Sequence, residues 1–525
     1  MVSGAFRHKP PLFILLPPQI GNVDPDPLKS GSFIRGYNLE KQTLEDCADR
    51  DWLFFFESKE INLPAGQEEK YAIVKKYWFT LLMAVVLLAA CAPAAAQTPP
   101  VPQDPQPAVD GAKVVVTWLA RLNEAENRWE TEVVIPDFER RNPNIKINLV
   151  IVPEVEFDGK MQAMVDASTP PDVWSHWGAA GFQEYLRRGM VADLTPFIQQ
   201  DRFDLSDFQE EALSAYTLDG RIMGLPVSIT GTFVFYNKDL FDKAGVEYPP
   251  TFWDNTTWTW EAFLEKCKAL TRVTGDPSTD IFGCSLAAWP NDQYPWLWGQ
   301  DIFPDTAYQT GFADTAYLDH PVVVEAFQAR RDLIWKLHYM PDPVQADAFG
   351  GGDLFQAQKI AMQISGGQVW KDLRDVTDFR WGAAALPYGS PGRKAVLFTD
   401  PWLLSSQSEH PEEAWTFLKF LVSPDVQESF MELSGATPVR KSLAAKWYAK
   451  FPSMDPPEVK EVHLGALRYG KESPSHLLVR FDALDQVISS ALEPVIKNEK
   501  LPGETLPAAN DRLIETLKQI QKAFE

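Results

Sequence analysis

The sequence predicts an α/β protein made of two linked lobes. The chain has 525 residues, more than one hydrophobic core usually holds, so two or three domains are expected. From Lys113 onward, segments with strand character alternate with segments of helical spacing, which indicates mostly parallel sheets covered by helices. The β-branched and aromatic run Thr232–Tyr236 has the composition of a buried strand, and it is placed to carry the chain from one lobe into a second.

The elements on either side of that strand follow from local spacing. Apolar residues from Trp129 to Phe138 recur at helical spacing, and Pro143 ends this helix. Thr257 or Thr259 is a natural cap for a helix that runs to Leu270. Further strands are predicted at 113–119, 145–152, 171–174, 281–286, 360–364, 381–386, 394–398 and 402–405, and further helices at 157–165, 240–244, 322–337, 411–421 and 506–524.

Composition excludes several classes of function. A net charge of −23 argues against nucleic acid or anionic lipid as a partner, because their phosphates would be repelled. The four cysteines show no spacing typical of a metal site, so no metal is expected. No cofactor is predicted either. Eighteen tryptophans are many for this length, and only Trp52 and Trp78 precede Cys91, which suggests an aromatic binding surface as well as a core.

The N-terminal part contains an export signal in an unusual place. Residues 1–73 show no sustained helical or strand period. Residues 74–91 then combine two lysines, an apolar run of about fourteen residues and small residues before Cys91, which is typical of a secretory signal peptide. Because such a signal should begin a chain, we expect translation to start at Val74, as from a GTG codon, and residues 1–73 to be a mis-annotated or disordered extension. Residues 92–111 are rich in Pro, Ala and Gln, as expected of a tether.

The end of this signal resembles a lipobox. The sequence Leu88-Ala89-Ala90-Cys91 is similar to the cleavage site of bacterial lipoproteins, and the resemblance implies that Cys91 is lipidated and becomes the mature N-terminus. The alternative is a transmembrane anchor with an incidental cysteine. The expectation is an exported, membrane-anchored protein at the cell surface or in the periplasm.

Several longer motifs resemble one family of transport proteins. The segment Asp219–Val246 (DGRIMGLPVSITGTFVFYNKDLFDKAGV) is similar to the first hinge strand of the extracellular solute-binding proteins of ABC importers. It looks most like family 1, the sugar-binding group that includes maltodextrin-binding proteins. The resemblance covers about residues 112–525, and further motifs follow in the family's order at 188–194, 355–364, 411–424 and 435–441.

The resemblance implies a fold and a function. The fold would be the two-lobed type II periplasmic-binding-protein fold, with a mostly parallel sheet flanked by helices in each lobe and hinge crossovers between them. Lobe 1 would comprise residues 112–229 and about 402–440, and lobe 2 residues 230–401 and about 441–525. The protein would be a monomeric receptor, not an enzyme, that captures a sugar or oligosaccharide by hinge closure and delivers it to an ABC permease.

Two other functions stay open on the sequence. The same fold could bind a non-sugar solute such as glycerol phosphate, a peptide or a polyamine. An exported glycoside hydrolase would need two carboxylates about 5–10 Å apart. Glu124 and Asp400 are a conceivable pair, but no supporting motif accompanies them.

Candidate ligand residues are aromatic and polar side chains at strand ends, where open α/β sheets bind ligands. Aromatic rings cover the C–H faces of a sugar, and amides, carboxylates and arginine pair with its hydroxyls. At least one of Trp289, Trp296 and Trp298 is expected to belong to the core, and the alternative for Arg440 is a surface salt bridge. Trp370 lies two positions beyond the place where the family has a stacking tryptophan, and Asp400 and Trp402 replace small residues of its second crossover. The candidates are Asn123, Glu124, Trp177, Thr230, Trp289, Asn291, Trp298, Trp370, Asp400, Trp402 and Arg440.

Cys267 and Cys284 lie on a predicted helix and the strand that follows it. An exported domain permits a disulfide between them, although only their geometry decides whether one forms.

Overall fold

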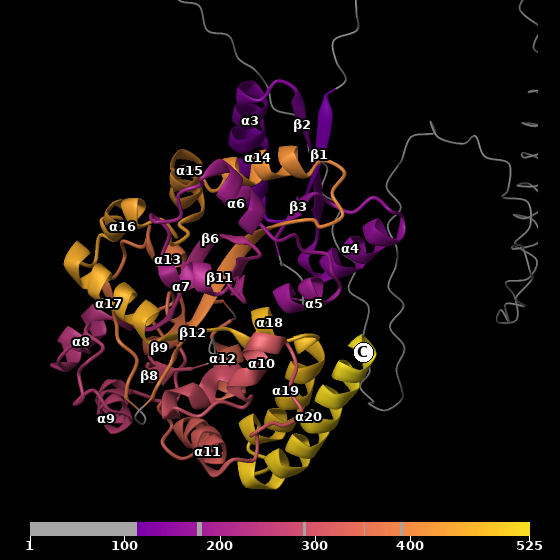
Figure 1. Cartoon of the computed structure of the whole chain (residues 1–525). Helices are drawn as coiled ribbons and strands as arrows, with labels where there is room; N and C mark the ends of the chain where they lie inside the picture. Colours follow the sequence, from indigo (N-terminus) through magenta and orange to yellow (C-terminus); the bar gives the residue numbers. More distant parts are fainter. Residues whose placement is uncertain (1–112, 176–180, 287–289, 351, 389–391) are drawn as a thin grey trace, which may run out of the picture. The chain divides into compact units, whose positions relative to one another are not determined.

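Two β-sheets organise the computed structural model, which describes residues 113–175, 181–286, 290–350, 352–388 and 392–525 (Figure 1). By its internal contacts the chain divides at Asp104, and every described residue belongs to the unit that follows. The first sheet has six strands in the order β12-β11-β3-β1-β2, with β6 paired to β11. The second has four strands in the order β10-β7-β9-β8.

The first sheet is built around β1 (Val114–Arg121), whose apolar residues fill both faces. It pairs in parallel with β2 (Ile145–Val152) and β3 (Val173–Trp174). The long strand β11 (Ala395–Leu404) runs antiparallel to β3 and to β6 (Leu225–Thr230), and its first residues pair in parallel with β12 (Gly470–Glu472). A short hairpin, β4 (Thr217–Leu218) and β5 (Arg221–Ile222), precedes β6.

Helices cover the first sheet, and the first of them starts earlier than the sequence predicts. The predicted helix from Trp129 begins at Glu124, because Asn123 caps its first turn. It contains a π-helical segment before Pro136 enters the next helix. The helices are α2 (Glu124–Trp129), η1 (Glu130–Val134), α3 (Ile135–Arg141), η2 (Glu154–Glu156), α4 (Phe157–Asp166), α5 (Gly181–Arg187), α6 (Thr195–Asp201), α7 (Glu210–Ser214), α14 (Pro411–Leu421) and α15 (Pro424–Ser434).

The second sheet is less parallel than predicted. Its strand β7 (Thr232–Asn237) runs antiparallel to β9 (Ile360–Gly366) and β10 (Trp381–Ala384), and only β8 (Phe282–Ser285) and β9 are parallel. The prediction of a mostly parallel sheet is therefore wrong for this sheet, because β7 enters it from the first sheet rather than through a helical crossover.

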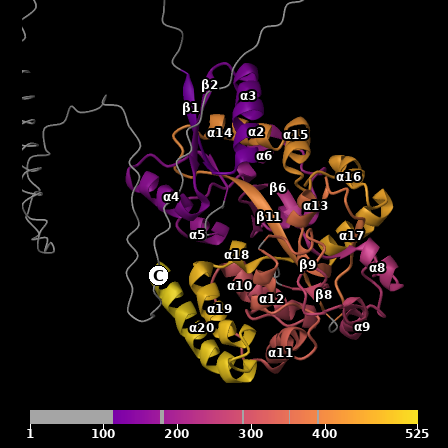
Figure 2. The same cartoon turned by 180° about the vertical axis from the view of Figure 1, so that it is seen from behind.

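Helices and 3-10 turns surround the second sheet. Figure 2 shows α19 and α20 running side by side near the C-terminus, where α20 also packs on α11. These elements are α8 (Lys238–Ala244), α9 (Trp260–Leu270), η3 (Asn291–Trp298), α10 (Asp305–Thr310), α11 (Pro321–Trp335), α12 (Pro343–Ala348), α13 (Gln368–Leu373), α16 (Lys441–Tyr448), α17 (Pro456–Arg468), α18 (Pro474–Leu477), α19 (Phe481–Ile496) and α20 (Pro502–Phe524).

The two sheets are joined where β6 becomes β7. Only Gly231 separates these strands, and a Cβ there would lie 2.7 Å from Cβ of Ala466, so the tight crossing has no room for a side chain. Strand β11 runs beside the crossing, and the backbone N–H of Val396 donates to Oγ1 of Thr232 at 3.0 Å. The predicted role of Thr232–Tyr236 as the strand that leads into a second sheet is confirmed.

Hydrophobic packing divides along the faces of β1. Val116 and Trp118 point into a core that covers one face of the first sheet. Leu119, on the opposite face, belongs to a larger core that extends through the second sheet. The alternating faces of a strand explain this division, and the shared core explains why both sheets fall in one compact unit.

The two predicted partners of a disulfide are unlinked. Cys267 on α9 and Cys284 on β8 are free thiols with no exposed surface, so the disulfide alternative is corrected. Burial raises the pKa of the Cys267 thiol, and a hydrogen bond with Cys284 acts in the same direction. The buried thiols thus serve as small apolar residues of the core.

Within the described residues no helix has the length and apolarity needed to cross a membrane. The predicted signal segment 74–91, the tether 92–111 and residues 1–73 lie outside the described residues.

Candidate functional site

The carboxyl ends of strands from both sheets meet at the crossover. In the first sheet β1 ends at Arg121 and β6 at Thr230. In the second sheet β9 ends at Gly366, which pairs with Thr232 at the start of β7. Loops that follow these strands therefore gather around Gly231, the place where ligands bind in open α/β sheets.

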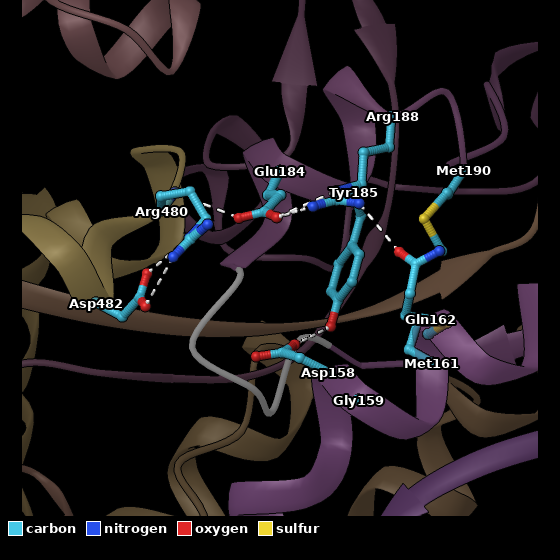
Figure 3. A pocket seen from close by; sticks show the side chains of 10 residues that line it. All are labelled: Asp158, Gly159, Met161, Gln162, Glu184, Tyr185, Arg188, Met190, Arg480 and Asp482. Carbon is cyan, nitrogen blue, oxygen red and sulfur yellow. Dashed lines mark hydrogen bonds and ion pairs between the residues drawn. The ribbon is translucent and has the colours of Figure 1, made fainter. Parts of the chain in front are cut away.

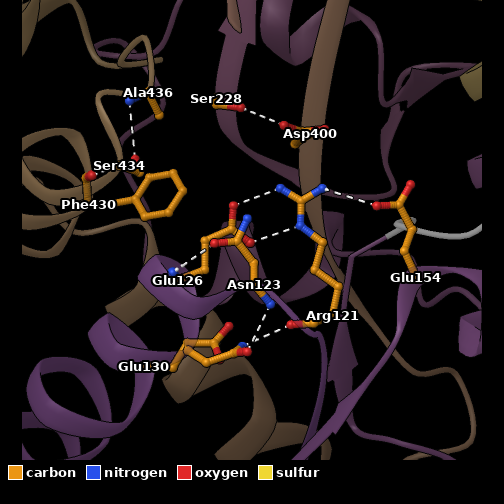
Figure 4. Close-up of polar contacts among 11 residues, drawn as sticks. Arg121, Asn123, Glu126, Glu130, Glu154, Ser228, Asp400, Phe430, Ser434 and Ala436 are labelled. Carbon is orange, nitrogen blue, oxygen red and sulfur yellow. Dashed lines mark hydrogen bonds and ion pairs between the residues drawn. The ribbon is translucent and has the colours of Figure 1, made fainter. Parts of the chain in front are cut away.

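Arg121 is the centre of a polar cluster on the first-sheet side (Figure 4). Its Nε and Nη2 donate to the two carboxylate oxygens of Glu126 at 2.9 and 2.7 Å, a bidentate pair. Its Nη1 lies 3.9 Å from the carboxylate of Glu154. The side chains of Arg121 and Glu126 keep 24% and 12% of their exposure, so the pair is largely buried but still reachable.

A second buried acid lies behind this pair. Asn127 donates both to the carbonyl of Arg121 and to Oε2 of Glu130, each at 2.8 Å. Burial raises the pKa of Glu130 to about 7, and the amide of Asn127 opposes the shift. Glu130 begins the π-helical segment η1, a feature that often accompanies functional sites.

Asp400 faces the same cluster from the crossover strand β11. Its Oδ2 accepts a hydrogen bond from the Ser228 hydroxyl at 2.7 Å, across the β6–β11 pair. Burial raises the pKa of Asp400, whereas His476, Ser228 and Arg121 lower it. The Asp400 carboxyl therefore lies between Arg121 of β1 and His476 of α18, which are far apart in the sequence.

Glu472 and His476 complete the cluster from the other side of β11. The N–H and hydroxyl of Thr399 donate to the two oxygens of Glu472 at 3.0 and 2.7 Å. Nδ1 of His476 also contacts this carboxylate, 2.5 Å from Oε1 of Glu472. Sequence reasoning missed both residues, because Glu472 lies 73 positions from Thr399 and only the β11–β12 pair brings it close.

A cavity of about 420 Å³ adjoins this cluster on the second-sheet side. Phe398, two positions before Asp400 and hence on the same face of β11, lines its wall. Asn291 donates to the hydroxyl of Ser489 at 3.2 Å, and Gln293 donates to the hydroxyl of Ser473 at 2.9 Å. Amides and hydroxyls beside aromatic rings suit a ligand rich in hydroxyl groups. The lining residues are Pro290, Asn291, Asp292, Gln293, Arg330, Phe398, Ser473, Ser475, Phe481, Asp485, Ser489 and Ile496.

A second cavity, of about 330 Å³, lies between α4, α5 and the start of α19 (Figure 3). Glu184 accepts from the guanidinium of Arg188 at 2.6 Å and from the backbone N–H of Arg480 at 3.3 Å. The Tyr185 hydroxyl donates to Asp158 at 2.7 Å, and its ring packs on Trp174 of the first sheet. Glu184 thus connects the helices of the first sheet to the C-terminal helices.

The same helices touch at a glycine. Gly181, the first residue of α5, has a φ of +70°, and a Cβ there would lie 2.5 Å from the carbonyl oxygen of Ser475 on α18. The backbones of α5 and α18 therefore meet more closely than any side chain would allow.

The predicted polar residues have mixed outcomes. Asn291 lines the 420 Å³ cavity, and Asp400 lies in the Arg121 cluster. Thr230 ends β6 at the crossover, and its Oγ1 is buried without a hydrogen-bond partner among the described residues. Asn123 is occupied as the cap of α2, and Glu124 is exposed in the first turn of that helix.

Three predicted tryptophan platforms belong to the core instead. Trp370 has no exposed surface and packs against Phe233, with ring centroids 5.4 Å apart. Trp402 packs on Trp118 at 5.4 Å, and Trp298 on Trp260 at 4.9 Å. The structure thus corrects the prediction that these rings face a ligand, since an indole is also a large apolar side chain that fills cores.

Arg440 is likewise a structural residue. Its guanidinium donates to the carbonyl of Val422 and to Asp207 and covers the ring of Phe208 at 4.3 Å. These contacts occupy its donors, so the prediction that it binds ligand is corrected. Trp177, Trp289 and Cys91 lie outside the described residues. No cluster of potential metal ligands occurs in the part of the chain that the structure describes.

Comparison with known families identifies the chain. Residues 123–428, more than half of its length, match the model of the bacterial extracellular solute-binding proteins. The chain belongs to this family. A solute-binding protein of an ABC transporter is the role that this membership supports.

Individual relatives agree with this assignment. The solute-binding protein is 28% identical over 323 residues to a binding protein of Brucella abortus (strain 2308), covering 60% of this chain and 74% of the relative. Over 149 residues it is 28% identical to the arabinooligosaccharide-binding protein of Bacillus subtilis (strain 168), covering 27% and 32% of the two chains. An ABC substrate-binding protein of Listeria monocytogenes, solved in complex with cycloalternan, matches with a TM-score of 0.63 at 23% identity, covering 77% of this chain and 99% of that one. The likeness shows the predicted two-lobed type II fold.

Proposed function

We propose that this solute-binding protein captures a sugar or oligosaccharide between its lobes and presents it to the membrane subunits of an ABC importer. The observation that carries the proposal is the cavity beside Phe398, where amides and hydroxyls stand next to aromatic rings at the crossover. The Bacillus relative binds arabinooligosaccharide and the Listeria structure holds cycloalternan, which supports the same class of ligand.

Capture would work by hinge closure. The lobes would comprise 112–229 with about 402–440, and 230–401 with about 441–525, which agrees with a crossing at Gly231. A ligand that touches Arg121 of the first lobe and Asn291 of the second gains all its contacts only when the lobes are closed. Binding then shifts the population toward the closed form that the permease would recognise.

The charges at the crossover argue against an anionic solute such as glycerol phosphate. Arg121 is already paired with Glu126, and Asp400 and Glu472 add two further carboxyl groups. A phosphate would meet more acids than free cations there. An uncharged polyol meets no such repulsion and offers donors to the same oxygens.

The ligand would be released unchanged. The family consists of substrate-binding proteins. Glu124, one of the two acids conceivable for a hydrolase, is exposed in the first turn of α2, while Asp400 is held by Ser228. Incubation with oligosaccharides followed by chromatography tests this point, and any new sugar product would contradict it.

We further propose that translation starts at Val74 and that residues 74–91 direct export of the protein. A lipid on Cys91 would then anchor it, with residues 92–111 as a tether. The signal-like run and its terminal cysteine support this. Metabolic labelling with radioactive palmitate should label the native protein and not its Cys91→Ala variant; a native precursor that contains Gly4 to Tyr71 would contradict the start at Val74.

The central experiment is a ligand screen. Mono- and oligosaccharides should be tested against the purified protein by thermal shift and then by calorimetry. We expect at least one sugar to raise the melting temperature and to bind at micromolar concentration, which corresponds to about −8 kcal/mol. Stabilisation by glycerol phosphate or a polyamine, with none by sugars, would overturn the proposal.

A further inference from the structure

Three polar side chains of the cavity beside Phe398 are buried without full hydrogen bonding. Asp292, Gln293 and Arg330 are 2%, 1% and 7% exposed. Among the described residues, no partner reaches Oδ2 of Asp292, Oε1 of Gln293 or Nε of Arg330. Buried polar atoms are normally paired, so three unpaired atoms beside one cavity indicate that something else satisfies them.

Asp292 stands out because its surroundings disfavour a negative charge. Arg330 on α11 is the nearby cation, but it donates to Asn291 and covers the ring of Tyr294 at 5.7 Å. Among the described residues, Arg330 is not one of the groups that shift the pKa of Asp292. Burial raises the pKa of Asp292 to about 8, and the hydrogen bond from Gln293 opposes the shift.

The other elements around Asp292 contribute mainly acids. Asp485 faces it from α19, and Asp301 lies just beyond η3, each raising its pKa further. Lys471 of β12 is paired with Asp301 at 2.7 Å. The remaining wall is uncharged and comprises Pro290, Asn291, Gln293, Phe398, Ser473, Ser475, Phe481, Ser489 and Ile496. Near neutral pH this carboxyl therefore carries its proton and has an O–H to donate.

We propose that Asp292 binds the solute as a neutral carboxylic acid, donating its O–H to a ligand oxygen, and that ionisation of this group weakens binding. The proposal rests on the proposed function and deepens it by naming a pH-dependent contact. A carboxylate has no proton to donate, so ionisation removes the contact and places a charge against the ligand oxygen. An uncharged polyol, whose hydroxyls both donate and accept, is the ligand that fits the neutral acid together with Gln293.

The test is calorimetric titration with arabinotriose, maltotriose and mannotriose between pH 6.5 and 9.5. For the sugar that binds, the Kd should rise about tenfold from pH 7 to pH 9, because only the protonated fraction of a group with a pKa near 8 is competent. In Asp292→Asn, whose amide keeps an N–H donor, we expect binding about threefold weaker at pH 7 but independent of pH.

Two further variants separate this role from a structural one. Asp485→Asn removes a neighbouring negative charge, so the loss of affinity should occur at a lower pH. Asp314→Asn, at an exposed aspartate, should leave the profile unchanged. If Asp292→Asn does not fold, the pH shift in Asp485→Asn still tests whether Asp292 contacts the ligand.

Sugar binding that is constant from pH 7 to pH 9, or an unshifted pH profile in Asp485→Asn, would overturn this inference and leave the proposed function standing. Binding of none of the three sugars at any pH, together with no stabilisation by any sugar of the ligand screen, would overturn the proposed function and this contact with it.

Discussion

The hydroxyl of Ser228 donates to the carboxylate of Asp400 at 2.7 Å, across the two strands that run together to the crossing between the sheets. The pair places an acid at the meeting point of the lobes, facing Arg121 on one side and His476 on the other.

We expect Asp400→Ala to weaken sugar binding by about tenfold or more, because a buried acceptor for a ligand hydroxyl is lost. Ser228→Ala removes only the residue that orients the carboxyl, so its effect should be smaller. Calorimetry on both variants gives the comparison. Equal affinity of Asp400→Ala and the parent protein would remove Asp400 from the site.

Gly181→Ala should impair closure of the lobes. Its added Cβ would lie 2.5 Å from the carbonyl oxygen of Ser475, so α5 and α18 could not approach as they do. Gly189→Ala is a matched control, since Gly189 has a similar φ of +69° but no atom within 4 Å of an added Cβ. Small-angle scattering with and without sugar should show a smaller contraction for Gly181→Ala alone. The same contraction in both variants would mean that this contact does not limit closure.

His463 should make the fold sensitive to acid. It is 2% exposed, and burial lowers its pKa to about 4. Below the ordinary value of 6.5 the unfolded chain binds a proton that the folded chain excludes. The free energy of unfolding should therefore fall by about 3 kcal/mol between pH 6.5 and pH 4 on account of this group.

Urea unfolding at several pH values measures that loss. His463→Gln should show a flatter pH dependence over this range, whereas His338→Asn, at an exposed histidine, should follow the parent protein. An unchanged slope in His463→Gln would show that other groups cause the acid sensitivity.

Arg440→Ala should lower stability rather than affinity. It would leave the carbonyl of Val422 and the carboxylate of Asp207 without a buried donor, at a cost of about 2–3 kcal/mol. Arg468→Ala is the control, because Arg468 is 70% exposed and its ion pair with Asp254 spans 3.7 Å, so the change should be below about 1 kcal/mol. The measurement is denaturant unfolding beside calorimetry. A large loss of sugar affinity in a stable Arg440→Ala protein would restore Arg440 to the binding site.

The local elements of this protein could be predicted because local spacing encodes them. Thr232–Tyr236 lies within β7, Pro411–Leu421 is helical throughout, and the polar residue Asn291 does line a cavity. The sequence could not separate ligand-facing tryptophans from core tryptophans, because an indole at a strand end fits either place. In the fold, Trp370 packs on Phe233 and Trp402 packs on Trp118, so both are core residues.

The sequence alone thus determined the α/β class, the strand that crosses between sheets and the family, because strand and helix periods and short motifs depend on neighbouring residues. The tertiary structure alone decided which acids gather around Arg121, that β7 runs antiparallel to its neighbours, and that Asp292 loses its access to water. Each of these depends on burial and on contacts between residues far apart in the chain, and such contacts leave no local trace in a single sequence.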